Sequence, residues 1–410
     1  MAMGVRPTNN DIISNTLSLS ESRGLTASPS RHDDDYSSII SSHDKEAQNE
    51  QKEQLTLSLL DSILHKPRLD ALLDCDANIM SYDPFSFFMV FGLRGRNFGM
   101  LCAPLLCLLL WDIIWAYLLE EEKAGPVIIT SLDGLISPLL TPVSFLLVFR
   151  LGRAAVRFWD SRAAFGKLVW ICRDIISTAA VACKYNQRRD LYDDFARWIC
   201  AFPIATKNFL RPDLPCTRDG HSRRCEIGPL LSDKDTEELL TPVNGGGSME
   251  FIAPIHVLDR MRELAYVLSF NNGPNVDQNA PYSSTDILQT QKGTALYRQL
   301  NEQIDTLCGT WGAMERIAAT PLPFVYVVHL RTFLLLYLFL WNLQGIGSNG
   351  WKAIPALLAA SWALLGIEAA AVECERPYQL HSNHLPLGIM CVVVAKNVAQ
   401  TIKTVGYLKD

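Results

Sequence analysis

The stretch FGMLCAPLLCLLLWDIIWAYLL, residues 98–119, decides the fold because its 22 residues carry one charged side chain, Asp112. A helix that crosses the hydrocarbon core of a membrane needs about 20 predominantly apolar residues, so this stretch predicts a membrane span. The alternative is a soluble helical protein in which such a helix is buried. The number of comparable stretches in the rest of the chain separates these two interpretations.

Three further apolar stretches occur, at residues 127–149, 322–341 and 351–372. The first of these contains Pro138 and Pro142, which membrane helices tolerate because neighbouring helices satisfy the freed carbonyl groups. Four long apolar stretches rarely occur together in a soluble chain, so we predict an all-α, multi-pass membrane protein with four transmembrane helices. Residues 385–395 are also apolar but too short to span, and they predict a packed helix.

Basic residues predict the orientation of these spans. Arg94 and Arg96 precede the first span, and Arg150 and Arg153 follow the second. Lysine and arginine in short loops favour the cytoplasmic side of a membrane. We therefore expect the N-terminus, the region between the second and third spans, and the C-terminus to share the inner side.

The charged residues are concentrated outside the spans. The 410-residue chain has a net charge of −6, and residues 153–320 hold 20 basic and 20 acidic groups. Helical periodicity in that region predicts a soluble, helical inner-side domain. The acidic balance lacks the basic footprint of nucleic-acid binding, so no nucleic-acid partner is expected. The 11 cysteines show no regular pairing and predict no disulfide framework.

The first residues of the chain have a different composition. Ten serines lie among the first 50 residues, which predicts a disordered tail over residues 1–75, and the membrane domain is then expected over residues 76–410. The tail has no apolar segment typical of a secretory signal, and its acidic residues argue against a plastid transit peptide. The compartment stays open between the plasma membrane and a plastid or thylakoid membrane.

Signals for an enzyme are weak. The segment Cys216–Cys225 with His221 matches no zinc spacing, and a flexible loop is the better interpretation. His381 and His384 lie near Glu373, Cys374 and Glu375 in the sequence. This group is either a metal cluster or the solvated end of a helix, and the sequence leaves both interpretations open. No nucleotide-binding or hydrolase motif occurs, so neither a cofactor nor a resident metal is expected.

The second span carries an aromatic stripe in TPVSFLLVFRLGRAAVRFWDSR, residues 141–162. Thr141, Phe145 and Phe149 recur every four residues and share one face of a helix. Packing in a core or against lipid is the usual role of such a stripe. A pore wall is the alternative, because the positive edges of aromatic rings offer an anion a weakly attractive lining.

Three motifs favour the pore. FRLGRAAVRFWDSR resembles a pattern of the bestrophin family of anion channels, in its plant, fungal and bacterial branch, with Gly152 and Ala155 departing from it. WGAMERIAATPLPFVYVVHLRTFLLLYLFLW, residues 311–341, and GIEAAAVECERPYQLHSNHLPL, residues 366–387, are similar to two more. The matching positions are Arg150, Arg157, Trp159, Arg162, Glu315, Arg316, Pro321, Pro323, His329, Glu368, Glu375, Pro377 and Asn383.

The resemblance implies a homopentamer around one pore, with a hydrophobic neck that aligns with Thr141, Phe145 and Phe149. It implies an anion channel for chloride, with bicarbonate as a further anion, embedded in a lipid bilayer. A carrier or accessory membrane protein, and less so a metal-dependent membrane enzyme, remain alternatives. Arg150, Arg157 and Arg162 either attract anions or hold helices together by pairing with Glu315 and Glu368. Residues 388–410 hold one acid, so calcium gating is not expected.

Overall fold

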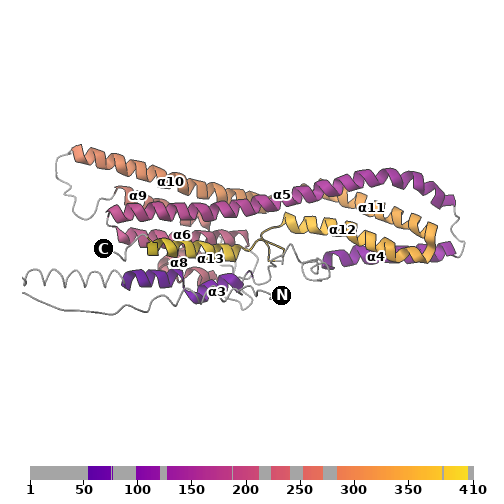
Figure 1. The fold of residues 1–410 in the computed structure, drawn as a ribbon, viewed down its shortest axis with the longest axis horizontal. Helices are drawn as coiled ribbons and strands as arrows, with labels where there is room; N and C mark the ends of the chain where they lie inside the picture. Colours follow the sequence, from indigo (N-terminus) through magenta and orange to yellow (C-terminus); the bar gives the residue numbers. More distant parts are fainter. Residues whose placement is uncertain are drawn as a thin grey trace, which may run out of the picture. The chain divides into compact units, whose positions relative to one another are not determined.

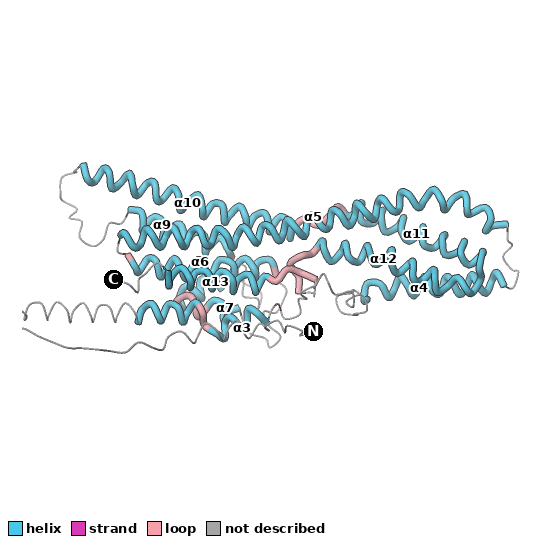
Figure 2. The backbone as a smooth tube through the Cα atoms, viewed as in Figure 1, coloured by secondary structure: helices cyan, strands magenta, loops and turns pink. Residues whose placement is uncertain are grey.

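The computed structural model describes residues 54–74, 76, 98–120, 127–186, 188–211, 223–240, 253–270, 284–380 and 383–404. Figure 2 shows that every regular element among these residues is helical, and none is a strand. The labelled helices are α3 (Lys66–Asp74), α4 (Phe98–Glu120), α5 (Val127–Asn186), α6 (Arg189–Leu210), α7 (Arg223–Ile227), α8 (Asp233–Leu240), α9 (Pro254–Phe270), α10 (Ser284–Ala319), α11 (Phe324–Asn349), η2 (Gly350–Ala353), α12 (Ile354–Glu375) and α13 (Leu387–Thr404).

The helix α5 joins two helical regions, because it runs for 60 residues from one into the other (Figure 1). Its first part lies beside α11 and α12, and its second part lies beside α6, α10 and α13. The expected end of the second span at residue 149 is therefore not the end of a helix. Apolar residues continue at helical spacing beyond the arginines, so the helix continues and only its surroundings change.

The first helical region consists of α4, the first part of α5, α11 and α12, packed around Leu108, Leu147, Leu338 and Leu365. Three stretches of the described chain are long and apolar enough to cross a membrane, at Gly99–Glu120, Ile136–Lys184 and Phe324–Glu375. The third stretch contains both α11 and α12. The chain reverses between them at Gly350, whose φ of 57° lies in the left-handed region that favours glycine.

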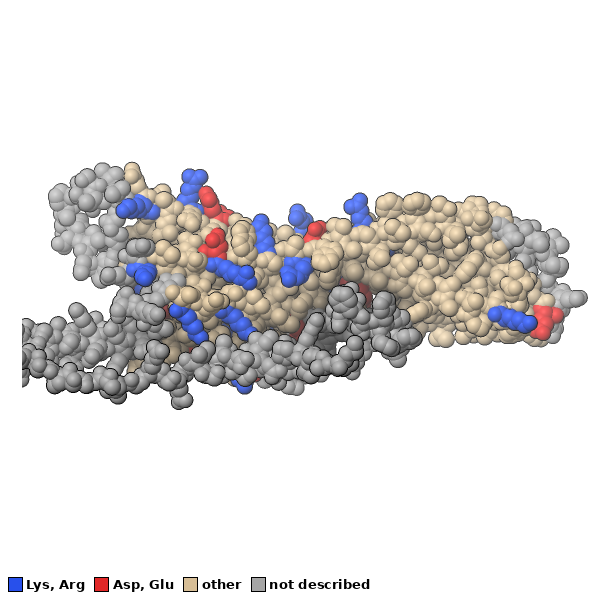
Figure 3. Space-filling view, in the orientation of Figure 1, with Lys and Arg blue, Asp and Glu red and all other residues tan. Residues whose placement is uncertain are grey.

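The second helical region surrounds α6, which is buried along most of its length. The neighbouring helices α9, α10 and α13 supply further apolar side chains to the same core. The helices α6 and α9 lie in the region 153–320 that the sequence predicts to be helical, and the short apolar stretch 385–395 lies mostly in the buried helix α13. Figure 3 shows charged side chains gathered over α9, α10 and the second part of α5, and almost none over α11.

The expected boundary of the tail at residue 75 is wrong. Residues 54–63 and α3 are helical, and Leu59, Ile63 and Leu72 are buried in the core of the second region. The serine-rich composition stops before these residues, and their leucines recur at helical spacing, so they can bury an apolar face. Residues 1–53 lie outside the described part of the chain.

Candidate functional site

An aromatic face lies on the membrane part of α5 and consists of Thr141, Phe145 and Phe149. All three are exposed in the single chain, and both phenylalanine side chains are 60% exposed. The two rings stack with their centroids 6.4 Å apart and their planes inclined by 27°. The sequence prediction that these residues share one face therefore holds. None of the described residues covers this aromatic surface.

The opposite face of α5 is buried against α11 and α12, where Val143 and Leu147 contribute to the apolar core. Arg150 follows them on this face and is fully buried. Its Nε lies 3.3 Å from Oε2 of Glu368, and its Nη2 donates to Oε2 of Glu375 at 2.6 Å. Because both carboxylates belong to α12, Arg150 holds the two helices together and presents no exposed guanidinium.

Two further arginines bind Glu368 and Glu375, one through a carboxylate and one through a backbone carbonyl. Arg331 of α11 donates from Nε to Oε1 of Glu368 at 2.9 Å. Arg157, two turns after Arg150, donates from Nε to the carbonyl of Glu375 at 3.0 Å and from Nη2 to the carbonyl of Ile317. We call Arg150, Arg157, Arg331, Glu368 and Glu375 the arginine cluster. It links α5 with α10, α11 and α12 at the junction of the two helical regions.

The arginine cluster also fixes the start of α11. The other oxygen of Glu375, Oε1, accepts a hydrogen bond from the backbone N–H of Leu322 at 3.2 Å. Leu322 lies between Pro321 and Pro323, whose rings supply no backbone donor. This carboxylate therefore satisfies the donor that remains in the segment between α10 and α11, and it ties that segment to α12.

The remaining motif residues lie outside the cluster. Trp159 is 68% exposed on α5, and its ring meets that of Phe158 at 87°. Arg162 and Arg316 are exposed, Glu315 is half-buried, and none of them has an ion pair within the described residues. The exposed ring of His329 lies 4.6 Å from that of Phe333. Pro377 is buried and Asn383 is exposed.

The alternative metal sites find little support in the geometry. His384 is buried with its Nε2 at 3.2 Å from Oε2 of Glu373, which is an ion-pair geometry. Within the described residues no group of three or more histidine, cysteine or acidic side chains could hold a metal. Cys225 is exposed, and Cys216, His221 and His381 lie outside the described residues.

Sequence analysis missed a polar group inside the apolar core of the first region. Asp112 of α4 is fully buried, and Asn342 of α11 donates from Nδ2 to its Oδ2 at 3.2 Å. Ser361 of α12 donates to Oδ1 of Asn342 at 3.5 Å. These three residues link α4 with α11 and α12. Asp112 is the only acid within its apolar stretch, and this isolated charge is the feature of the sequence that could have indicated a buried polar group.

A polar groove lies beside the arginine cluster, with a volume of about 320 Å³. Arg157, Pro321 and Glu375 line one part of it, and Tyr378 lines another. Burial raises the pKa of Tyr378 to about 12, so its phenol stays neutral at physiological pH. The groove therefore adds no charge of its own beyond the arginine cluster and Arg376.

The fold, and the arginine cluster at the junction of its two helical regions, define the class of protein. It is a helical protein with one membrane region and one helical region rich in charged residues. The chain belongs to the bestrophin family, since the family described as "Bacterial/Fungal Bestrophin protein" matches residues 78–251 and 275–400. A voltage-dependent anion channel-forming protein of Nostoc sp. is 28% identical over 316 residues, which cover 76% of this chain and 90% of the relative. A protein of the same description from Synechocystis sp. is 28% identical over 266 residues, covering 64% of this chain and 75% of the relative.

Solved structures have the same fold. A crystal structure of a bacterial bestrophin homologue from Klebsiella pneumoniae aligns with a TM-score of 0.57 and 20% sequence identity. The alignment covers 74% of this chain and 98% of that structure. Family membership and the apolar helices identify the chain as an integral membrane protein of the bestrophin family.

Proposed function

We propose that this protein is an anion channel that conducts chloride, with bicarbonate as a second anion, through the central pore of a homopentamer. The observation that carries the proposal is the uncovered aromatic face on a membrane helix of a bestrophin-family chain. The relatives named as anion channel-forming proteins support the same function. Five copies of one helix arranged about an axis give each side chain a ring of five around the pore.

In this proposal the four membrane-spanning helices are α4, the first part of α5, α11 and α12, and the channel comprises residues 54–410. Thr141, Phe145 and Phe149 form the neck. A narrow ring of apolar side chains resists wetting and limits conduction, while the electropositive ring edges favour anions over cations. The arginine cluster has a structural role here, because its guanidinium groups are paired with carboxylates or with carbonyl oxygens.

Ion flux through the purified full chain tests this function. The protein is reconstituted in liposomes under separate chloride and cation gradients, and the reversal potential is measured. We expect the reversal potential to follow the chloride gradient and single-channel steps to appear. Transport that saturates with concentration and shows no unitary current would instead indicate a carrier, and a reversal potential that follows the cation gradient would reject anion selectivity.

Replacement of Phe145 and Phe149 by alanine tests the neck. Truncation of both rings removes the apolar barrier, so we expect larger currents per assembled protein and weaker gating, with anion selectivity only partly reduced. Leu140→Ala is the matched control, because Leu140 is 49% exposed on the same helix but about 140° away from Phe145 around its axis. Unchanged conductance in a correctly assembled double variant would show that these rings do not line the constriction.

A further inference from the structure

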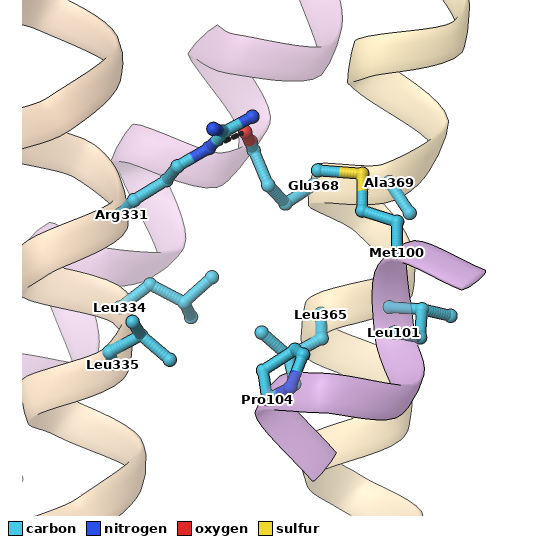
Figure 4. Close-up of a pocket in the computed structure, with 9 residues that line it drawn as sticks. All are labelled: Met100, Leu101, Pro104, Arg331, Leu334, Leu335, Leu365, Glu368 and Ala369. Atoms are coloured by element: carbon cyan, nitrogen blue, oxygen red, sulfur yellow. Dashed lines mark hydrogen bonds and ion pairs between the residues drawn. The ribbon is translucent and has the colours of Figure 1, made fainter. Parts of the chain in front are cut away.

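A cavity of about 140 Å³ lies between α4, α11 and α12, beside the arginine cluster (Figure 4). Most of its wall is apolar and comes from Met100, Leu101, Pro104, Leu334, Leu335 and Leu365. An apolar protein cavity of about 150 Å³ stays free of water and binds a small hydrocarbon such as benzene. The cavity therefore suits a short length of hydrocarbon chain.

The cavity has one polar end, formed by Arg331 and Glu368. Figure 4 shows the guanidinium of Arg331 above the leucines of α11, with its Nε directed to Glu368. The side chain of Arg331 is 43% exposed, and its terminal nitrogens donate to no other group in the described part of the chain. These N–H groups remain available for an acceptor outside the chain.

The charges around this polar end favour an anion. The arginine cluster contains three guanidinium groups and two carboxylates, so it carries one excess positive charge. Glu368 is compensated by Arg150 on its other oxygen, at 3.3 Å, and does not depend on Arg331 alone. A guanidinium with free N–H groups matches the paired oxygens of a phosphate.

The position of the cavity along the helices fits a lipid headgroup. Its α4 residues lie within the first two turns of that helix, and Glu368 is two turns before the end of α12. The cavity thus lies at the end of the apolar bundle, next to the charged helical region, where lipid phosphates are located. Basic pockets between membrane helices at this level are typical binding sites for anionic headgroups.

We propose that this cavity binds one anionic phospholipid, with its phosphate on Arg331 and the upper part of an acyl chain between Leu334, Leu335 and Pro104. The bound lipid fills the space between α4 and α11 and compensates the excess charge of the arginine cluster. The site is separate from the aromatic face, so this inference does not depend on the proposed function.

Lipid retention by the full-length protein tests the site. The purified protein is exchanged into nanodiscs that contain equal amounts of phosphatidylglycerol and phosphatidylcholine, and the lipid that remains after extraction into mild detergent is counted by native mass spectrometry. We expect the wild type to retain about one phosphatidylglycerol per chain and several-fold less phosphatidylcholine. Equal retention of the two lipids, or retention of neither, would overturn the proposal.

Four variants separate the site from general lipid contact. Arg331→Gln removes the phosphate partner and Leu335→Trp fills the cavity, and each should lower retained phosphatidylglycerol several-fold. Arg331→Lys keeps the charge and should retain the lipid. Leu336→Trp is the matched control for volume, because Leu336 is the next residue on α11, 49% exposed and outside the cavity lining.

The same measurement identifies a different occupant. A neighbouring copy of the chain that covers the cavity would leave the wild type without retained phosphatidylglycerol, and it would make Leu335→Trp weaken assembly instead. If Arg331→Gln fails to assemble, Leu335→Trp and Arg331→Lys still decide the proposal. Wild-type retention in the Leu335→Trp variant would place the lipid elsewhere and overturn it.

Discussion

At the scale of single residues, Arg150 is the side chain on which the junction most depends. It is fully buried between Glu368 and Glu375, and Glu375 has no other arginine side chain at salt-bridge distance in the described residues. Removing one partner of a buried ion pair leaves an uncompensated charge and costs about 3–5 kcal/mol. We expect Arg150→Met to lower the free energy of unfolding by that amount, measured by thermal unfolding in detergent.

The control for this prediction is Arg153→Met. Arg153 is an exposed arginine of the same helix, so the same substitution should change the free energy of unfolding by less than about 0.5 kcal/mol. Equal effects at both positions would mean that the loss comes from the helix surface and not from the buried pair.

Asp193 gives the helical region a predictable dependence on pH. Burial raises the pKa of Asp193 to about 6, although Nε of Arg189 lies 3.8 Å from its carboxylate. The unfolded chain has a lower pKa of about 3.9, so the folded protein binds the proton more tightly. The contribution of this group to stability is therefore greatest below pH 4 and is lost as the pH rises through 6.

The substitution Asp193→Asn removes that dependence. Relative to this variant, the wild type should lose on the order of 2 kcal/mol of stability between pH 4 and pH 7, measured by chemical unfolding of the full chain. Asp190→Asn is the contrasting control, since hydrogen bonds from Arg188 lower the pKa of Asp190. The wild type should be more stable than this variant above about pH 4, and that advantage should disappear as the pH falls below 4.

These residue-scale features could be predicted only in part from the sequence. The arginines and acids of the cluster stand out because they flank or interrupt apolar stretches, and the spacing of Thr141, Phe145 and Phe149 gives their common face directly. The partner of Arg150 could not be derived from spacing, because Glu368 lies 218 residues further along the chain. Only the packing of α5 against α12 decides which arginine meets which carboxylate.

At the scale of elements, the length of apolar stretches predicts the membrane helices well and their ends poorly. The expected spans 98–119 and 351–372 differ from α4 and α12 by no more than three residues at each end. The second span is extended in the structure to Asn186 because a helix need not end where the membrane ends. Hydropathy shows where the surroundings of a helix change from lipid to water. The helix itself ends only at a residue or a contact that breaks it.

The contact between α3 and α13 depends on a glycine. Gly388 lies at the start of α13, where an added Cβ would collide with the carbonyl oxygen of Leu72. The next residue, Ile389, donates its N–H to Oδ2 of Asp76 at 2.8 Å, so the backbone of α13 is held close to this segment. An added methyl group must push the helices apart. We expect Gly388→Ala to lower the free energy of unfolding by about 1–3 kcal/mol, measured by thermal unfolding.

Gly309→Ala is the matched control for this contact. Gly309 lies in the interior of α10, where an added Cβ meets nothing within 4 Å. Alanine stabilises a helix interior by about 0.5–1 kcal/mol relative to glycine, so this variant should be at least as stable as the wild type. A loss of stability at both positions would indicate that the effect does not arise from the contact with α3.

At the scale of the whole molecule, exposed apolar side chains lie next to the charged junction as well as along the lipid-facing helices. Phe324 and Val325 at the start of α11 are 80% and 78% exposed, and Trp159 is 68% exposed on α5. Phe324 and Val325 follow Leu322, whose backbone N–H donates to Glu375, and Trp159 follows Arg157 of the arginine cluster. All three therefore lie at the end of the apolar bundle. In our proposed pentamer, another copy of the protein covers these side chains.

Assembly therefore should depend on these side chains more than on lipid-facing ones. We expect the wild type to run in native mass spectrometry at five times the mass of one chain, and Phe324→Ser to shift the protein towards smaller species. The control is Leu110→Ser, since Leu110 is 59% exposed on α4 within the apolar bundle, where lipid is the expected cover.

Interfaces between copies lose most of their stability when a large buried aromatic side chain is truncated, whereas one polar hydroxyl facing lipid leaves other contacts unchanged. A Phe324→Ser variant that remains pentameric would show that α11 begins outside the interface, and a wild type that conducts as a monomer would reject the central pore itself.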